Sequence, residues 1–339
     1  MRSGPHSIAL LVLTLASLVA CGHAAARETA LYNASFDPTR EFYVDYNRAF
    51  ASYWRQRTGE AVDIRMHHGG SGEQVQAILG GLDADVATLA LAADIDALAQ
   101  AGLLAADWRT RLPDASVPYT STIVLLVRKG NPQRIHDWAD LVRPGVRVVT
   151  PDPRTSGGGR WNYLAAWAWA SRAHRDGTQV LDWMRRLFRN VVAADAGART
   201  ATTTFVEGGR GDVLLAWESE ALRLLADPRT SQALEIVYPS LSIRAEPQVA
   251  RIDRNVDAHG ARERADAYLQ YLYSPTGQRL AAQHHYRPVD PSQVPASQRA
   301  RFRAVPMVTV DAAFGGWQHA QRVHFAAGGL FDHVAGAAR

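Results

Sequence analysis

The chain has 339 residues, of which 47% are hydrophobic and 21% are charged, a composition typical of a globular protein with room for more than one domain. Its 37 Lys and Arg residues nearly balance its 33 Asp and Glu residues, so the net charge is only +4, and no long run of like charge occurs. This charge distribution argues against a nucleic-acid-binding protein.

The first residues have the pattern of an export signal. Arg2 precedes an apolar run over residues 8–20, which is followed by small residues that end at Ala26. We therefore expect residues 1–26 to be a signal peptide and the mature protein to be exported into an oxidising compartment. No later stretch is apolar for long enough to predict a membrane-spanning helix.

A second cleavage site overlaps this signal. The segment Leu18-Val19-Ala20-Cys21 resembles the cleavage box of bacterial lipoproteins, and its use would leave Cys21 as a lipidated N-terminus. We favour cleavage after Ala26, because that site lies close to the first predicted strand. Cys21 is the only cysteine, so the mature chain then has no intrachain disulfide.

The first part of the mature chain alternates strands with helices. The expected strands are residues 29–35, 61–66 and 85–91. The expected helices begin at Asp37 and cover residues 73–79 and 93–101. In the first helix Phe42, Tyr46, Phe50 and Trp54 form an apolar stripe that we assign to the core. This alternation predicts an α/β fold with a mostly parallel sheet and helices on both faces.

A second group of strands follows a break at Pro118. A long β-branched run over residues 119–127 indicates that the chain crosses into a second lobe. Further strands are expected over residues 146–150, 191–194 and 211–217. Residues 246–252 are the predicted return strand, and the C-terminal third is helical. We therefore expect a first lobe of residues 27–118 plus 246–339, a second lobe of residues 119–245, and a hinge at the connections.

Two glycine-rich stretches each follow a predicted strand and precede a helix. They are His68-Gly69-Gly70-Ser71-Gly72 and Thr155-Ser156-Gly157-Gly158-Gly159. Consecutive glycines let backbone N–H groups converge, and the free donors and positive dipole end of a helix favour a negative ligand there. One such stretch is weak evidence, but the pair predicts an anion-binding site.

Catalytic and cofactor motifs are incomplete. The stretch His68–Gly72 is similar to the oxyanion loop of lipases, but the chain lacks the G-x-S-x-G elbow that would supply a nucleophile. A secreted serine hydrolase that uses Ser71 or Ser156 remains the alternative from another class, and it requires a histidine beside one of these serines. Lys129, the only lysine, is not in a phosphate loop, and no G-x-G-x-x-G fingerprint occurs, so we expect no nucleotide cofactor.

The histidine pairs do not predict a metal site. His67 and His68 would point to opposite faces of a strand, and His284 and His285 would diverge on a helix. His319 and His324 have the wrong spacing for one helical face, and no acidic cluster accompanies them.

The remaining chemistry consists of hydrogen-bond donors without a catalytic partner. These are the hydroxyls of Ser71 and Ser156, the neighbouring glycine amides, and amides near Asp37 and Ala198. A fully deprotonated tetrahedral oxyanion such as sulfate accepts hydrogen bonds at every oxygen and donates none. Phosphate at neutral pH keeps protons that would face donors, so such a pocket would discriminate against it. An arginine clamp by Arg160 or Arg199 is the alternative way to hold an anion.

Ordered blocks along the mature chain carry a specific resemblance to a known family. The blocks are residues 33–41, 68–72, 85–92, 118–132, 155–166, 197–206, 211–218 and 314–329. Through these blocks the chain closely resembles the periplasmic sulfate- and thiosulfate-binding proteins that serve ABC importers.

The resemblance implies a fold and a site. The fold is the two-lobed periplasmic binding protein fold of type II, in which the ligand lies in a cleft between the lobes. The implied ligand donors are the amides of Asp37, Gly157, Gly158 and Ala198, the hydroxyls of Ser71 and Ser156, and the indole N–H of Trp217. The side chain of Asp37 would cap the helix while its amide faces the ligand.

The resemblance also implies a function. We expect a non-enzymatic monomer that captures sulfate or thiosulfate without a cofactor and delivers it to the permease subunits of an ABC importer. Molybdate or another oxyanion is the alternative ligand, because sequence alone does not separate these anions.

Overall fold

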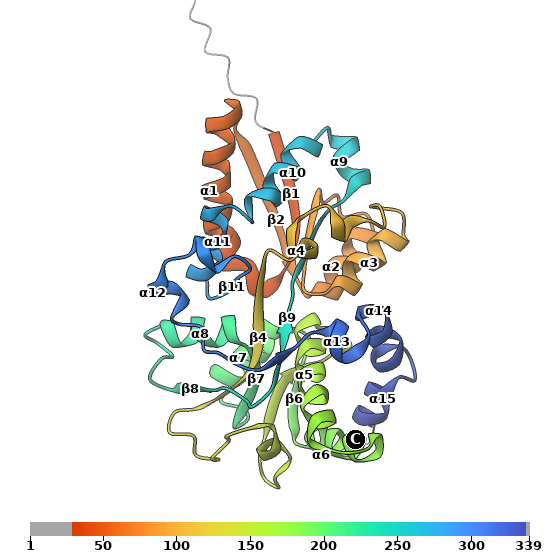
Figure 1. The fold of residues 1–339 in the computed structure, drawn as a ribbon, viewed down its shortest axis with the longest axis vertical. Coiled ribbons are helices and arrows are strands. Elements are labelled where there is room, and N and C mark those ends of the chain that lie inside the picture. The colour runs from red at the N-terminus through yellow and green to blue at the C-terminus, as the bar shows by residue number, and fades with distance from the viewer. Residues whose placement is uncertain (1–28, 337–339) are drawn as a thin grey trace, which may run out of the picture.

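The computed structural model describes residues 29–336. The expected signal peptide over residues 1–26 and the alternative lipid attachment at Cys21 lie outside the described residues. Two β-sheets with flanking helices make up the described chain, one above the other in Figure 1. The expected α/β fold is therefore confirmed. Within residues 29–336, no helix has the length and apolar composition needed to span a bilayer.

The first sheet has four strands in the order β10-β3-β1-β2. They are β1 (Thr29–Phe36), β2 (Val62–Gly69), β3 (Val86–Leu89) and β10 (Gln248–Arg251). β1 is parallel to β2 and β3, whereas β10 runs antiparallel to β3. β2 continues beyond its expected end, so His67 and His68 lie on the strand, where His67 is exposed and His68 is partly buried.

The second sheet has eight strands, with the path β12-β9-β4-β7-β5-β6 and with β8 and β11 also paired to β4. Their bounds are β4 (Tyr119–Arg128), β5 (Val148–Pro151), β6 (Val191–Asp195), β7 (Val213–Trp217), β8 (Leu234–Val237), β9 (Ser242–Ala245), β11 (Arg287–Pro288) and β12 (Met307–Val308). β5 is parallel to β6 and β7, but β4 is antiparallel to β7, β8 and β9. The second sheet is thus mixed rather than mostly parallel, because β4 enters it from the first sheet.

The helices and turns lie between these strands. Around the first sheet they are η1 (Asp37–Thr39), α1 (Arg40–Thr58), α2 (Ser71–Leu79), α3 (Ala92–Gln100), η2 (Trp108–Thr110), α4 (Pro113–Ser116), α9 (Asp253–His259), α10 (Arg262–Tyr271) and α11 (Pro275–Gln283). Around the second they are η3 (Trp138–Val142), α5 (Gly157–Ala173), α6 (Gly177–Arg189), α7 (Ala198–Val206) and α8 (Glu218–Ala226). The last part of the chain adds η4 (Pro291–Gln293), α12 (Ala296–Arg299), α13 (Val310–Phe314), α14 (Trp317–Ala320), the π-helix η5 (Gln321–Phe325) and α15 (Leu330–Ala335).

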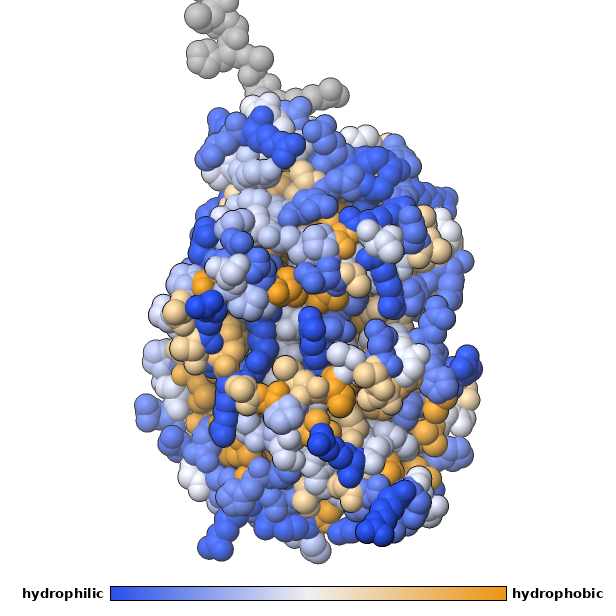
Figure 2. Space-filling view, viewed as in Figure 1, coloured by the Kyte–Doolittle hydropathy of each residue, from blue (hydrophilic) through white to orange (hydrophobic). Residues whose placement is uncertain are grey.

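The apolar stripe of α1 and both faces of β4 form core. Phe42, Tyr46, Phe50 and Trp54 are buried as expected, and the rings of Tyr46 and Phe50 each lie 5.1 Å from that of Tyr268 on α10. Alternate residues of β4 belong to two different hydrophobic clusters, because successive side chains point to opposite faces of a strand. The exterior shown in Figure 2 mixes hydrophilic and hydrophobic residues, and its hydrophobic residues are more frequent around the second sheet.

Three segments of the chain connect the two sheets. They are residues 117–118 before β4, residues 246–247 between β9 and β10, and residues 284–286 between α11 and β11. β12 pairs with β9, and α15 contacts α6, so the chain returns to the second sheet, as Figure 1 shows at its lower right. This third connection differs from the expected division, which assigned all of residues 246–339 to the first lobe.

The π-helix η5 places His324 in an aromatic environment. The residue is 5% exposed, its ring lies 4.8 Å from the Trp167 ring, and its Nδ1 is 3.1 Å from the Tyr163 hydroxyl. Burial disfavours the charged imidazolium and lowers the pKa of His324 to about 4. His324 is therefore neutral in the folded protein at neutral pH.

Replacement of His324 by Phe should flatten the pH dependence of stability. Below the ordinary histidine pKa of about 6.5 the unfolded chain takes up a proton that folded His324 refuses until about pH 4, so acid destabilises the native protein. We expect His324 to account for about 2 kcal/mol of the stability lost between about pH 7 and pH 4.5, measured by urea unfolding. His136→Phe is the control, since His136 is exposed before η3, and an unchanged pH profile in H324F would contradict this account.

Candidate anion-binding site

The expected donors all lie where a helix begins after a strand. Asp37 is the first residue of η1 after β1, and Ser71 is the first residue of α2 after β2. Ser156 is the N-cap of α5, and Trp217 ends β7 and is the N-cap of α8. Ala198 is the first residue of α7 after β6. Helix starts present free N–H groups and the positive end of the dipole, and ligands of open α/β sheets bind beyond the carboxyl ends of strands.

The donors of the second sheet lie close together around Gly158. A Cβ placed on Gly158 would be 3.4 Å from both the Ala198 Cβ and the Ser156 Oγ, and 3.6 Å from the Trp217 Nε1. Three helix starts, those of α5, α7 and α8, therefore meet at one point.

The first sheet faces this group directly. A Cβ placed on Gly157 would be 2.8 Å from the Ala90 Cβ and 3.2 Å from the Ser71 Cβ. The ring of Phe36, which precedes Asp37, lies 5.6 Å from the Trp217 ring, and η1 contacts α7. The expected donors of both sheets thus border one buried region between the sheets.

Trp217 carries the clearest indication that a ligand belongs there. Its side chain is 4% exposed, and its Nε1 has no acceptor among residues 29–336. A buried donor without a partner costs about 1–3 kcal/mol, a penalty that a bound acceptor removes.

The first turn of α5 offers two more donors. The Ser156 Oγ accepts a hydrogen bond from the Gly159 N–H at 3.2 Å and caps the helix. The amides of Gly157 and Gly158 occupy the first two helical positions, where no intrahelical acceptor exists. In contrast with the sequence analysis, these glycines lie inside the helix rather than in a loop before it.

Ser71 is engaged differently from the expectation. Its hydroxyl donates to the Asp94 Oδ2 at 2.5 Å and accepts from the Ala90 N–H at 3.0 Å. Asp94 is buried, and burial raises the pKa of its carboxyl group. Sequence reasoning missed Asp94, although its place in the first turn of α3, after a buried strand, matches the pattern of the donors.

Asp37 also departs from its expected role. Phe36 rather than Asp37 is the N-cap residue, and no side chain caps this turn. The Asp37 Oδ1 instead accepts from the Arg40 Nη2 at 2.7 Å and from its Nε at 3.2 Å. The carboxylate is thus held by an arginine three residues later, while the Asp37 amide keeps the first position of the turn.

Arg160 and Arg199 join the two halves of the protein. The Arg199 Nη2 binds both carboxylate oxygens of Glu41 on α1, at 2.9 and 2.8 Å. The Arg160 Nη1 lies 3.7 Å from the Asp94 Oδ1, and its Nε donates to the Pro153 carbonyl at 3.0 Å. Because both guanidinium groups already have acceptors, an arginine clamp is the less favoured way to hold the anion.

The alternative chemistries depend on the partners of the two serines and on clusters of metal-ligand residue types within residues 29–336. Neither the Ser71 nor the Ser156 hydroxyl has a histidine partner within residues 29–336, so the serine hydrolase alternative lacks its base. No group of three or more His, Cys, Asp or Glu residues in that range could hold a metal ion.

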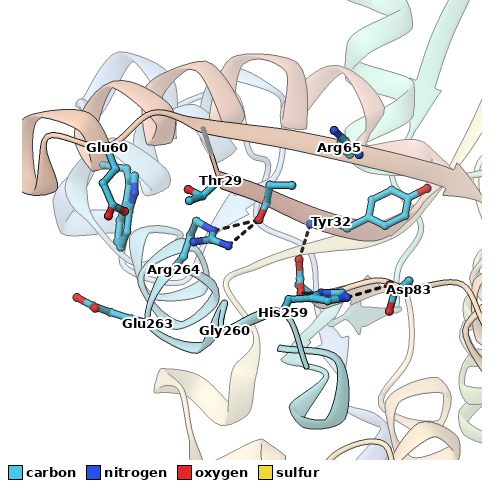
Figure 3. A pocket seen from close by; sticks show the side chains of 12 residues that line it. Thr29, Tyr32, Glu60, Arg65, Asp83, His259, Gly260, Glu263 and Arg264 are labelled. Atoms are coloured by element: carbon cyan, nitrogen blue, oxygen red, sulfur yellow. Dashed lines mark hydrogen bonds and ion pairs between the residues drawn. The ribbon is translucent and has the colours of Figure 1, made fainter. Parts of the chain in front are cut away.

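A separate cavity of about 910 Å³ lies beside β1, α9 and α10, and Figure 3 shows it. His259 contacts Asp85 at 2.7 Å and Asp83 at 2.9 Å, and these hydrogen bonds raise its pKa. The Arg264 guanidinium donates to the Ala30 carbonyl at 2.8 and 3.1 Å. The strong donors of this cavity already have partners and carboxylates beside them, so it suits an anion poorly.

Comparisons with known proteins agree with this fold and site. A family model described as "Bacterial extracellular solute-binding protein" matches residues 42–287. The sulfate-binding protein SubI from Mycobacterium tuberculosis superposes with a TM-score of 0.76 at 30% identity, covering 87% of this chain and 98% of that one. Two sheets that meet at an interface lined by helix starts thus define a solute-binding protein of the periplasmic binding protein class.

Proteins of similar sequence identify the family within this class of solute-binding proteins. The chain is 52% identical to the sulfate-binding protein of Escherichia coli (strain K12), covering 94% of this chain and 97% of that protein. It is 44% identical to the thiosulfate-binding protein of Pseudomonas aeruginosa, covering 94% and 96%. The chain belongs to the family of sulfate- and thiosulfate-binding proteins.

Proposed function

We propose that this protein is a periplasmic receptor that encloses sulfate between its two halves and delivers it to an ABC importer. The observation that carries the proposal is the buried Nε1 of Trp217, which has no acceptor among the residues that the structure describes and lies beside the starts of α5 and α7. The names of the relatives from E. coli and M. tuberculosis support sulfate as the ligand.

The proposed ligand contacts are hydrogen-bond donors only. They are the amides of Asp37, Gly157, Gly158 and Ala198, the hydroxyls of Ser71 and Ser156, and the indole of Trp217. For Ser71 this role requires the hydroxyl proton to turn from Asp94 toward the ligand and Asp94 to donate to the Ser71 Oγ as a neutral carboxylic acid, a form that burial favours by raising its pKa. A site of this kind accepts a dianion without any countercharge in contact and disfavours an oxyanion that carries a proton.

The proposed function also requires the two halves of the protein to open and close about a hinge. The proposed hinge consists of the connections between the sheets, and the first lobe consists of residues 29–118 and 246–283, with residues 287–336 joined to the second lobe. Residues 1–26 act as the signal peptide, and the mature monomer docks on permease subunits. Because Ser71, Ser156, Gly157, Gly158 and Trp217 are buried between the halves, with Asp37 and Ala198 partly buried, ligand entry requires the halves to separate.

Calorimetric titration of the mature protein tests the ligand. We expect tight binding of sulfate, weaker or comparable binding of thiosulfate, and no saturable binding of phosphate at neutral pH. Thiosulfate is the second candidate, since the P. aeruginosa relative is named for it. Binding of phosphate or molybdate in preference to both sulfur oxyanions would contradict the proposal.

A further inference from the structure

The third connection between the sheets contacts both sides of the candidate anion site. The Tyr286 hydroxyl donates to the Pro38 carbonyl at 3.0 Å, and Pro38 directly follows Asp37. The next residue, Arg287, donates from Nε and Nη2 to the two carboxylate oxygens of Glu218, at 2.6 and 2.8 Å. Glu218 directly follows Trp217. Two consecutive residues therefore hold the neighbours of two expected donors that come from different sheets.

Both contacts are buried. Tyr286 is 2% exposed, and the side chains of Glu218 and Arg287 are 0% and 15% exposed. A carboxylate that is fully buried is tolerated only where a partner such as a bidentate guanidinium compensates its charge. The start of α8 is therefore fixed to Arg287 more firmly than a surface ion pair would fix it.

The two residues are themselves held in place. Arg287 pairs with Thr120 in the β11–β4 ladder, and the Tyr286 ring lies 4.6 Å from the Tyr119 ring. The Arg287 Nη2 also donates to the Arg303 carbonyl at 2.6 Å. This anchoring at the first residues of β4 places the pair directly beside the connection at residues 117–118.

We propose that Tyr286 and Arg287, here called the crossing bracket, are positioning residues that set the Trp217 indole and the Asp37 amide in register for the ligand. The bracket acts on the ligand through Glu218 and Pro38 and does not touch it. The inference rests on the proposed function and deepens it. Hydrogen bonds weaken steeply with misalignment. A small shift of the Asp37 amide or of the Trp217 indole therefore lowers affinity without removing a donor.

A double-mutant cycle tests the arm that runs through Trp217. Glu218→Gln removes the carboxylate charge but keeps the shape of the side chain, and Arg287→Lys removes the bidentate fork but keeps the charge. In the unaltered background we expect each to weaken sulfate binding about fivefold to thirtyfold in calorimetric titration. In the Trp217→Phe background the same substitutions should weaken binding less than about twofold, because the indole through which they act is gone.

The contact between Tyr286 and Pro38 predicts a different result in the same cycle. Tyr286→Phe removes the hydrogen bond to Pro38, and since this arm does not run through Trp217, it should weaken binding about equally in both backgrounds. The cycle thus separates the two arms of the bracket.

The matched control is an ion pair at the start of β7, the strand that ends at Trp217. Arg147 binds Asp212 in a fork at 2.8 and 3.2 Å, and Asp212 immediately precedes β7 just as Glu218 follows it. Asp212→Asn should lower the melting temperature and leave sulfate affinity unchanged.

The outcomes distinguish the two proposals. The positioning role of the crossing bracket is overturned if the effects of Glu218→Gln and Arg287→Lys on the sulfate binding free energy add to that of Trp217→Phe. It is also overturned if Asp212→Asn weakens sulfate binding as much as these two substitutions do. In both cases the proposed receptor function stands. If the unaltered protein does not bind sulfate, the proposed function fails. If Glu218→Gln does not fold, the cycle of Arg287→Lys with Trp217→Phe alone tests the positioning role.

Discussion

Replacement of Trp217 by Phe is expected to weaken sulfate binding by about 1–3 kcal/mol, or roughly fivefold to 150-fold in the dissociation constant. The substitution keeps an aromatic ring beside Phe36 but removes the Nε1–H, which is buried and has no acceptor among the described residues. Since the ligand is the proposed acceptor, the loss should appear in the bound state, as measured by isothermal titration calorimetry.

A second buried indole provides the control. The Trp138 Nε1 donates to the Leu241 carbonyl at 2.8 Å, and its side chain is fully buried around the second sheet. Trp138→Phe should therefore lower stability in thermal unfolding and leave sulfate affinity unchanged. Equal affinities for W217F and the unaltered protein would remove Trp217 from the site.

Replacement of Gly157 by Ala is expected to raise the dissociation constant roughly fivefold to 150-fold, because overpacking a tight contact costs about 1–3 kcal/mol. The new Cβ would stand 2.8 Å from the Ala90 Cβ, and Ala90 follows β3 of the first sheet. This contact exists only when the two halves are together, so a protein with separated halves avoids it. We expect the ligand-free melting temperature to change little while affinity falls.

Gly177→Ala is the matched control for this helix position. Gly177 is also the first residue of a helix, α6, and a Cβ placed there would meet nothing within 4 Å. Its affinity should equal that of the unaltered protein. If G157A binds sulfate as tightly as G177A, the halves do not close on the ligand as we describe.

The order of strand, glycine stretch and helix was predictable from sequence, whereas several contacts around it were not. This order has a local cause, although α2 and α5 begin within the glycine stretches, at Ser71 and Gly157, rather than after them. The engagement of Ser71 by Asp94 could not, because it joins residues 23 positions apart across a tertiary contact. Asp37 followed local rules for a cap, but Arg40 competes for its carboxylate.

The third connection between the sheets escaped prediction for a different reason. β11 and β12 have two residues each, too few for any periodic pattern of hydrophobic residues to emerge. Their partners on β4 and β9 lie far away in the sequence. The crossing bracket therefore became visible only once the fold was known.

The location of a bound tetrahedral dianion tests the central claim most directly. Crystals grown with selenate, an analogue of sulfate, would locate the anion by the anomalous signal of selenium. We predict one strong peak between the sheets, with the amides of Gly157, Gly158 and Ala198 and the Trp217 Nε1 as neighbours. A peak elsewhere, or a carboxylate oxygen within hydrogen-bond distance of the anion, would contradict a site built from uncharged donors.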